Sequence, residues 1–558
     1  MSRKRSSGNF ALALRFVRNA IRPNVEVTKA PADIHVDWDV PVAVRDGTIL
    51  RVNVFRPNAA GPVPVIMSAH PYGKDRIPAK TRSGRGLPPQ TRLLPQPHPI
   101  RFSEWTSWEA PDPVFWVSRG YAVINADLRG GGTSEGTAEL FSDQEALDYY
   151  DLIEWAGVQS WSSGRIGLDG VSYLAISQYK VAALRPPHLA AICPWEGLSD
   201  MYRDFARPGG IREDGFSILW SAITSREARV GTPIREQIVK RPERDAWYES
   251  VTPALERIEV PILVCASFSD HLLHTRGSFE VFRRAGSVRK WLYTHRDGKW
   301  SAYYSEEATR ARNRFFDHTL KGLDNGWATE PAVRLAITEA GPDPVAVVSE
   351  ETWPPKDLTW RKLWLDARSK AMTEGAAPAL PASLRFKSRH GVAAFLWDAP
   401  EDLDVIGPMV LHLNVEMAGA EDIHLFVELR KLSSGVEVAF EGSYGFSGDG
   451  VSKGWQRAAH RELDLRLSTP EQPVHRHDRV EPLGVGEIVP VQIALRPHAT
   501  RFRKGDQLRV EIRGKWNYPR NPLFGQFPAG YQRSPKGLCT LHTGGTANAY
   551  LLLGTRAI

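Results

Sequence analysis

Along the first half of the chain, short and mainly apolar runs alternate with longer segments in which apolar residues recur every three or four positions. The apolar runs are residues 63–68, 121–126, 165–168, 260–266 and 291–293. Two of the segments between them, residues 143–156 and 174–184, have helical periodicity. Apolar runs of this kind are typical of strands buried on both faces. The alternation predicts an α/β fold in which helices cover a mostly parallel sheet.

The segment before the first apolar run has a different pattern. Residues 39–57 alternate apolar and polar positions around Asp46-Gly47. An Asp-Gly pair between two alternating segments is typical of a β-hairpin. We therefore expect the fold to open with antiparallel strands.

Two long stretches interrupt the alternation of strands and helices. Residues 80–111 are rich in Pro, Arg and Trp, and they predict a long excursion near the site. Residues 200–255 are helix-like, with many aromatic and charged side chains, and the strand pattern resumes at residue 260. An insertion at this point predicts a cap of about residues 200–256.

From about residue 330 the helical periodicity nearly disappears. Short alternating runs recur at residues 333–337, 410–415, 423–429, 491–495 and 508–512, separated by turn residues. This pattern predicts an all-β sandwich, which we expect to be a jelly roll of roughly 220 residues.

Composition narrows the class of protein. The chain has 558 residues, of which 42% are hydrophobic and 24% are charged, which is ordinary for a globular protein. The net charge of +7 is small for this length, and arginines lie among acidic residues, so no nucleic-acid partner is expected. No apolar run reaches the roughly 18 residues of a membrane span. Cys193, Cys265 and Cys539 lie far apart and predict buried free thiols, which suggests the cytoplasm.

The N-terminal segment is basic and amphipathic. Phe10, Leu14, Val17 and Ile21 share one helical face, and Arg15, Arg18 and Arg22 are interspersed among them. The pattern predicts a helix that docks on the body of the protein or on a second copy of the chain, which would make a homo-oligomer. Contact with a membrane surface and a targeting peptide are the less favoured interpretations.

A candidate nucleophile follows the run at residues 165–168. Gly170 precedes Ser172 by two positions, and a helical segment of small residues begins at once. A strand that turns directly into a helix projects the serine hydroxyl from the end of a sheet, as in a nucleophile elbow. Position 174 is leucine where glycine is usual. A literal Gly-x-Ser-x-Gly surrounds Ser134, but no helix follows it directly, so Ser134 is the weaker candidate and a purely structural Ser172 is the alternative.

Serine needs a base and an orienting carboxylate, and in this fold class they follow the serine in the order acid, then histidine. Asp270 comes just past the run at residues 260–266, where its alternative role is a helix N-cap. His295 follows the next strand and is the predicted base. His271 and His274 compete with it, but they lie in the turn or helix after Asp270.

An oxyanion hole needs two hydrogen-bond donors near the serine. One predicted donor is the backbone N–H of Tyr173. The second is the phenol of Tyr72, which lies in the turn after the run at residues 63–68 and stays protonated at neutral pH. A packed aromatic ring is the alternative role of Tyr72.

These motifs together resemble the α/β-hydrolase family that contains cocaine esterase, α-amino-acid ester hydrolases and X-Pro dipeptidyl peptidases. The resemblance covers nearly everything after residue 38. Its motifs are residues 44–47, 71–74, 127–130, 161–167, 170–173, 267–270 and 293–295, with Pro497, Phe502 and residues 505–510 in the late β region. Two departures are Ala175 in place of a common glycine and Leu292-Tyr293 in place of a common Pro-Trp before the histidine.

The resemblance implies a domain organisation and a site. The domains would be an N-terminal extension at 1–35, an α/β-hydrolase domain at 36–330 with the helical cap, and a jelly-roll domain at 331–558. Ser172, Asp270 and His295 would form the triad, with Tyr72 and Tyr173 as the oxyanion hole. Trp220, Phe268 and Phe205 hold positions that line the acyl pocket in this family, although a core role is equally open for all three.

The leading hypothesis is a serine hydrolase that cleaves small carboxylic esters or amides through an acyl-enzyme, without metal or cofactor. The alternative is an X-Pro-type dipeptidyl peptidase or an α-amino-acid ester hydrolase. A dipeptidyl peptidase needs carboxylates in the cap for a substrate ammonium group, and the available ones are Glu196, Asp200, Asp204, Glu213 and Asp214. A non-catalytic binding protein is less favoured. His475 and His477 are interpreted as a solvated loop rather than a metal site.

Overall fold

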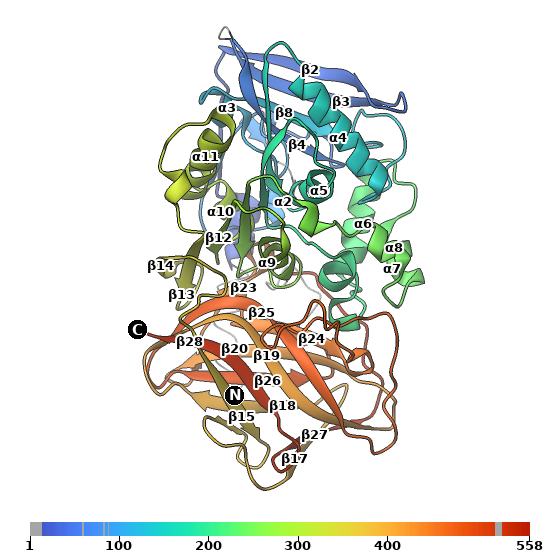
Figure 1. Cartoon of the computed structure of the whole chain (residues 1–558), viewed down its shortest axis with the longest axis vertical. Helices are drawn as coiled ribbons and strands as arrows, with labels where there is room; N and C mark the ends of the chain where they lie inside the picture. The colour runs from blue at the N-terminus through green and yellow to red at the C-terminus, as the bar shows by residue number, and fades with distance from the viewer. Residues whose placement is uncertain (1–13, 59–60, 82–83, 88, 519–526) are drawn as a thin grey trace.

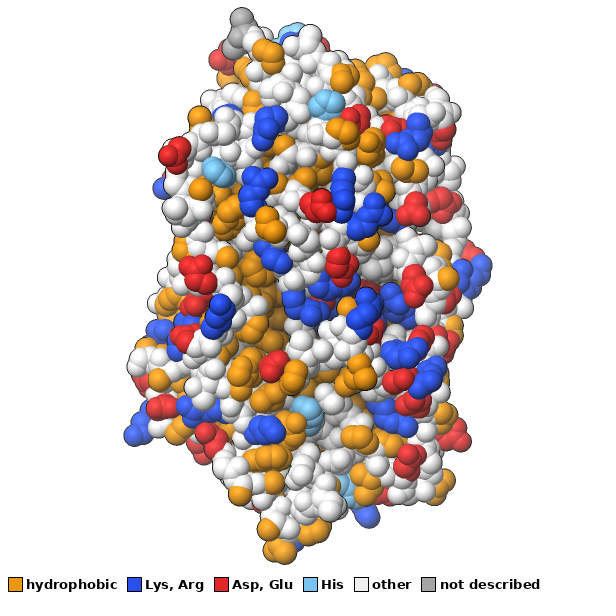
Figure 2. Space-filling model, viewed as in Figure 1, with side chains coloured by type: hydrophobic (Ala, Val, Ile, Leu, Met, Phe, Trp, Pro, Cys, Tyr) orange, Lys and Arg blue, Asp and Glu red, His pale blue; other side chains and the backbone are white. Residues whose placement is uncertain are grey.

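The computed structural model describes residues 14–58, 61–81, 84–87, 89–518 and 527–558 (Figure 1). An α/β domain occupies the upper part of the view, and a β domain the lower part. In the space-filling view, charged side chains of both signs are interspersed over the visible face (Figure 2).

A long mixed sheet forms the centre of the α/β domain. From one edge to the other, its strands are β2 (Ile34–Ala43), β3 (Ile49–Pro57), β8 (Ala122–Asp127), β4 (Val63–His70), β9 (Ser162–Val171), β10 (Leu189–Trp195), β11 (Ile262–Ser267), β12 (Lys290–His295), β13 (Val333–Thr338) and β14 (Pro344–Glu350). The seven strands from β8 to β13 run parallel, and the pairs at both edges are antiparallel. The predicted hairpin around Asp46-Gly47 is confirmed as β2 and β3.

Helices cover both faces of this sheet, as the alternation predicted. α4 (Asp143–Gly157), α5 (Tyr173–Ala182) and α9 (Thr275–Arg284) pack on one face, and α3 (Pro113–Val117) and α11 (Glu306–Lys321) pack on the other. In Figure 1, α11 and α3 lie to the left of the sheet and α4 to its right. Because apolar side chains are buried on both sides, the central strands are mainly apolar along their length.

The two interruptions of the alternation form structures of their own. The first contains β5 (Ala79–Thr81), β6 (Gly84–Gly86), α2 (Pro89–Leu93) and β7 (Ile100–Ser103), and β7 pairs with β1 (Val25–Thr28). The second lies between β10 and β11 and contains a π-helical turn η1 (Met201–Ala206), α6 (Phe216–Glu227), α7 (Ile234–Lys240) and α8 (Ala246–Ser250). This second insertion lies at the residues predicted for the cap.

The C-terminal domain is all-β, with a core between two sets of antiparallel strands. One set is β16 (Ala371–Thr373), β15 (Thr359–Asp366), β28 (Tyr550–Ala557), β19 (Leu403–Ala418) and β25 (Val489–Phe502), with β27 (Leu538–Thr543) and β17 (Ala382–Lys387) at the other end of β19. The other set is β18 (Val392–Asp398), β26 (Gln507–Arg513), β20 (His424–Ser433) and β24 (Ser452–Arg457).

The two domains share hydrogen bonds at their junction. β13 and β14 follow the boundary predicted at residue 330, yet they continue the sheet of the first domain. A bridge between Thr338 and Thr500 then joins β13 to β25 of the second domain. The α/β domain and the all-β domain agree with the predicted classes, and the jelly-roll arrangement stays a prediction.

Residues 14–21 form a helix that docks on the body of the protein, although through a different face from the predicted one. Phe16 and Asn19 are buried, whereas Leu14, Val17 and Ile21 are exposed. The ring of Phe16 stacks on Phe446 of the second domain with centroids 5.3 Å apart. Phe10 lies outside the described residues.

The three cysteines agree with the expectation of buried free thiols. Cys193, Cys265 and Cys539 are free thiols and all are buried. In the part of the chain that the structure describes, no helix combines the length and the apolar character that crossing a membrane requires.

Candidate active site

Ser172 lies at the sharp turn between β9 and α5. Its φ of 59° and ψ of −114° are strained for a residue with a side chain. Gly170 makes the turn possible, because its φ is 149° and a Cβ there would lie 2.5 Å from the Cβ of Leu174. The leucine at position 174 is therefore accommodated by the glycine two residues before the serine. This geometry is that of a nucleophile elbow.

His274 is the histidine that contacts Ser172. Its Nε2 lies 3.2 Å from Ser172 Oγ, and its Nδ1 lies 2.5 Å from Asp270 Oδ2. All three side chains are buried. Serine, imidazole and carboxylate thus form one continuous hydrogen-bonded chain, the arrangement that allows a serine hydroxyl to lose its proton to a base.

His295, the base predicted from the sequence, is engaged elsewhere. It is the last residue of β12, its Nε2 lies 3.1 Å from Glu196 Oε1, and its ring stacks on Trp195. The sequence analysis assigned the base by strand order. The structure instead brings a histidine to the serine from the turn that follows Asp270.

A lysine completes the buried cluster. Lys299 Nζ lies 3.0 Å from Asp270 Oδ2 and 2.9 Å from His274 Nδ1. Burial by itself would raise the pKa of Asp270, but the charge of Lys299 and the hydrogen bond from His274 hold that pKa well below its ordinary value. Burial and the Lys299 ammonium lower the pKa of His274, against the opposing effect of Asp270. The acid is therefore ionised and the base neutral near pH 7.

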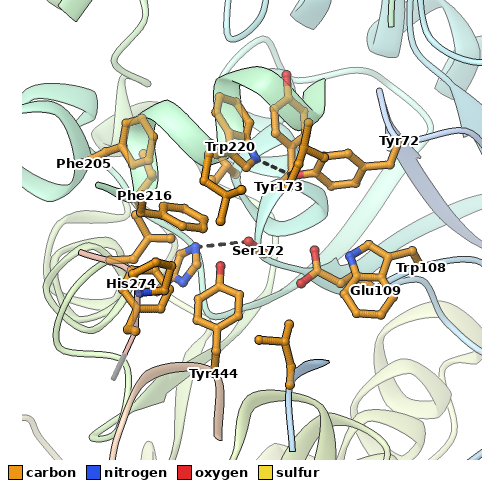
Figure 3. Close-up of a pocket in the computed structure, with 18 of the residues that line it drawn as sticks. Tyr72, Trp108, Glu109, Ser172, Tyr173, Phe205, Phe216, Trp220, His274 and Tyr444 are labelled. Carbon is orange, nitrogen blue, oxygen red and sulfur yellow. Dashed lines mark hydrogen bonds between the residues drawn. The ribbon is translucent and has the colours of Figure 1, made fainter. Parts of the chain in front are cut away.

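The two predicted oxyanion donors lie on the other side of the serine (Figure 3). Tyr173 is the first residue of α5, where a backbone N–H has no partner within the helix. Tyr72 Oη accepts a hydrogen bond of 3.0 Å from Trp220 Nε1, which leaves its own hydrogen available for donation. Burial raises the pKa of Tyr72 well above its ordinary value, so this phenol is neutral.

An apolar pocket opens in front of Ser172. Its empty volume is about 900 Å³, including the part open to solvent. Its aromatic walls come from the α/β core, the cap and the β domain, and they include Tyr72, Trp108, Phe141, Tyr173, Phe205, Phe216, Trp220, Trp300, Tyr444, Phe446 and Phe527. Trp220 and Phe205 are among the residues that line this pocket. Phe268 does not line the pocket, because its ring packs on Phe279 and Trp353 in the core.

Two carboxyl groups line this pocket, those of Glu227 and Glu109. Glu227 pairs with Arg76. Glu109 is drawn in Figure 3 with its carboxyl group toward the pocket. Glu109 has a left-handed φ of 61°, and its carboxylate accepts a hydrogen bond of 3.1 Å from Trp300 Nε1. Burial raises the pKa of Glu109 to about 7. Nothing in the sequence pattern singled out this residue, because it lies in the irregular excursion after β4.

The cap carboxylates that a dipeptidyl peptidase would need are engaged away from the pocket. Asp200 pairs with Arg203, Asp204 with Arg276 and Asp214 with Arg235. Glu196 lies against His295, and Glu213 accepts backbone hydrogen bonds from residues 215–217 and 530. None of the five is among the residues that line the pocket.

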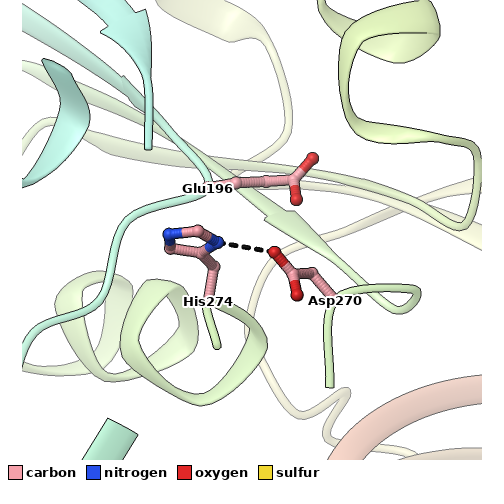
Figure 4. Close-up of side chains that lie close together, drawn as sticks. All are labelled: Glu196, Asp270 and His274. Atoms are coloured by element: carbon pink, nitrogen blue, oxygen red, sulfur yellow. Dashed lines mark hydrogen bonds and ion pairs between the residues drawn. The ribbon is translucent and has the colours of Figure 1, made fainter. Parts of the chain in front are cut away.

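Glu196, Asp270 and His274 lie close enough to be tested as metal ligands (Figure 4). One ligand atom from each falls within 4.8 Å of the others. However, the ammonium of Lys299 already lies 3.0 Å from Asp270 Oδ2, and Asp270 Oδ2 also binds His274. The cluster therefore fits an internal ion pair better than a metal ion.

Two further sequence interpretations can be compared with the structure. Ser134 donates a hydrogen bond to Asp127 O and accepts one from the Arg51 N–H, so it stabilises a loop.

The expectation of a solvated loop for His475 and His477 is wrong, because both are buried. Burial and the charge of Arg203 lower the pKa of His475 to about 3.

The fold and the Ser172–His274–Asp270 arrangement are those of the serine hydrolases with an α/β-hydrolase fold. Comparisons with known proteins also indicate a hydrolase. The family profile of the X-Pro dipeptidyl-peptidase (S15 family) matches residues 46–236, and that of the X-Pro dipeptidyl-peptidase C-terminal non-catalytic domain matches residues 325–552.

A similar solved structure is that of a CocE/NonD family hydrolase from Staphylococcus aureus. It is 35% identical, covers 94% of each chain and has a TM-score of 0.88. The protein belongs to this family of hydrolases, whose members act on ester or peptide bonds.

Two curated relatives are more distant. Cocaine esterase from Rhodococcus sp. is 26% identical over 69% of this chain and 71% of its own length. A putative Xaa-Pro dipeptidyl-peptidase from Bacillus anthracis is 25% identical over 42% of this chain and 45% of its own.

Proposed function

We propose that this enzyme hydrolyses carboxylic esters with a bulky apolar acyl group through an acyl-enzyme on Ser172. The observation that carries the proposal is the hydrogen-bonded chain from Ser172 through His274 to Asp270 at the floor of an aromatic pocket. The proposal assigns the base to His274 in place of His295. The C-terminal β domain, which the family resemblance predicts to be a jelly roll, contributes part of the pocket wall.

The proposed reaction begins with a proton transfer. His274 Nε2 takes the proton of Ser172 Oγ while the oxygen attacks the ester carbonyl carbon. The Tyr72 phenol and the Tyr173 N–H donate to the resulting oxyanion. His274 then gives the proton to the leaving alkoxide, and a water molecule repeats the sequence to release the acid. Asp270 accepts a hydrogen bond from the Nδ1–H of His274 throughout, and this bond fixes the tautomer in which Nε2 is free to accept the serine proton.

The pocket favours an ester over an N-terminal dipeptide. A substrate ammonium group needs an ionised partner, and the five cap acids named above are engaged elsewhere. Glu227 of α6 lines the pocket but pairs with Arg76. Glu109 also lines the pocket, but burial raises its pKa to about 7, so it is only half ionised at that pH and becomes neutral below it. We therefore expect hydrolysis of an aromatic acyl ester to exceed hydrolysis of an X-Pro anilide.

The proposed nucleophile can be tested by labelling. A fluorophosphonate probe should label the wild-type protein, and Ser172→Ala should abolish both labelling and hydrolysis of an activated ester. Ser134→Ala is the matched control, because Ser134 belongs to the literal Gly-x-Ser-x-Gly, and this variant should label like the wild type. Labelling that persists in Ser172→Ala would reject the assignment and would favour another nucleophile.

A further inference from the structure

Lys299 has an environment that the reaction described above does not use. It is the first residue of α10 (Lys299–Tyr303), in the loop after β12, and it is 1% exposed. Its Nζ contacts both Asp270 Oδ2 and His274 Nδ1, at 3.0 and 2.9 Å. Its other side faces the ring of Tyr444, whose centroid is 3.9 Å away. A buried lysine therefore lies directly behind the acid–base pair.

The bonding pattern at Asp270 determines what this lysine can do. An ammonium group only donates hydrogen bonds, so Lys299 gives its hydrogen to the carboxylate. The Nδ1–Oδ2 distance of 2.5 Å requires a hydrogen between these atoms, and with Asp270 ionised that hydrogen belongs to His274. Two donors thus share one carboxylate oxygen, and the lysine brings a full positive charge next to the imidazole.

The charges around His274 are unevenly placed. Asp270 and Lys299 contact the ring at Nδ1, and Ser172 contacts it at Nε2. Glu196, which directly follows β10, adds a negative charge that raises the pKa of His274. The charge of Lys299 in turn interacts with the nearby acids Glu196 and Glu109, and its ammonium lies against the ring of Tyr444. A positive charge within 4 Å of the ring disfavours imidazolium, while the Asp270 carboxylate favours it.

We propose that Lys299 is a positioning residue for the proposed reaction: its ammonium holds the Asp270 carboxylate and keeps His274 uncharged until Ser172 gives up its proton. This role rests on the proposed function of Ser172 and His274. It accounts for the burial of Lys299 next to Asp270 and His274. The loop after β12 thus supplies a cation to the site, while the histidine at the end of that strand, His295, pairs with Glu196.

The test is the pH dependence of kcat/KM for an activated ester. Lys299→Met removes the charge and keeps a long apolar side chain, and it should move the acid limb of the profile upward by about one pH unit. Lys299→Arg retains the charge and should keep the acid limb near its wild-type position. Lys431→Met is the matched control. The Lys431 side chain is also buried, at 2% exposed, but it pairs with Asp506 of the β domain and not with Asp270 or His274. The acid limb of Lys431→Met should not move.

An acid limb of Lys299→Met at the wild-type position would overturn the proposal. If that variant does not fold, the imidazole of His274 can be titrated by NMR in the wild type and in Lys299→Gln. A His274 pKa that is higher in Lys299→Gln than in the wild type supports the proposal, and an equal pKa in the two proteins overturns it. Failure of the proposed function itself is distinguishable, because the wild-type protein would then neither label with the fluorophosphonate nor hydrolyse the ester.

Discussion

Asp270 and His274 lie in the same backbone turn, directly after β11. The N–H groups of Leu273, His274 and Thr275 all donate to the carbonyl oxygen of Asp270. This closed turn brings residues four positions apart onto one side, so His274 Nδ1 meets the Asp270 carboxylate. The imidazole is thereby oriented from its own turn, and its other nitrogen faces Ser172.

The assignment of the base predicts different results for two histidine variants. His274→Ala should lower kcat by at least about 100-fold, because it removes the group that accepts the serine proton. His295→Ala should have a much smaller effect on kcat, since His295 contacts Glu196 rather than the serine. Steady-state kinetics with one activated ester measure both. A larger loss in His295→Ala than in His274→Ala would return the role of base to His295.

At the scale of elements, the helix at residues 14–21 supports one side of the pocket. Phe16 stacks on Phe446, which lines the pocket, and Asn19 Nδ2 donates to the carbonyl oxygens of Thr91 and Arg92. Arg15 donates to Pro95 O and to Glu441. The helix therefore joins the excursion after β4 to the β domain, next to Leu94 and Phe446 of the pocket wall.

This contact predicts a difference between two neighbouring variants of the helix. Phe16 is 6% exposed and Val17 is 57% exposed. Phe16→Ala should weaken docking of the helix by about 3 kcal/mol, speed hydrogen exchange at residues 14–21 and raise KM for a bulky ester. Val17→Ala is the control, with little expected change. Equal exchange rates in the two variants would show that the Phe16 contact does not hold the helix.

At the scale of the whole molecule, the pocket needs three parts of the chain. The α/β domain supplies Ser172, Tyr72 and Tyr173. The cap supplies Phe216 and Trp220, and the β domain supplies Tyr444 and Phe527. The ring of Phe527 packs on Phe216 with centroids 4.7 Å apart and on Tyr444 at 4.9 Å. The β domain therefore forms a wall of the candidate active site.

A variant of that wall should change selectivity more than turnover. Phe527→Ala removes contacts with a large acyl group, so kcat/KM for an aromatic acyl ester should fall by about 10-fold. The value for an acetyl ester should change little, because a small acyl group does not reach this wall. The ratio of the two values is the measurement. An equal loss for both esters would mean that Phe527 supports the structure and not the acyl group.

Much of the architecture could be read from local patterns. Apolar runs gave the parallel strands, Asp46-Gly47 gave the hairpin, and Gly170 with Ser172 gave the elbow, because each depends on residues close in the sequence. Asp270 was placed for the same reason, at the end of a buried strand. These features follow from periodicity and from backbone conformations that few residues adopt.

Only the tertiary structure decided which histidine faces the serine, which aromatic rings line the pocket, and where Lys299 and Glu109 lie. His274 and His295 both lie close to the ends of strands. The backbone turn after Asp270 directs His274, and not His295, toward Ser172. Phe268 and Trp220 have the same apolar character, but one packs in the core and the other faces Tyr72. The sequence by itself determined the elements and the position of Ser172 at the elbow, because these are local. The partners of that serine come from chain segments about a hundred residues away, and only packing brings them together.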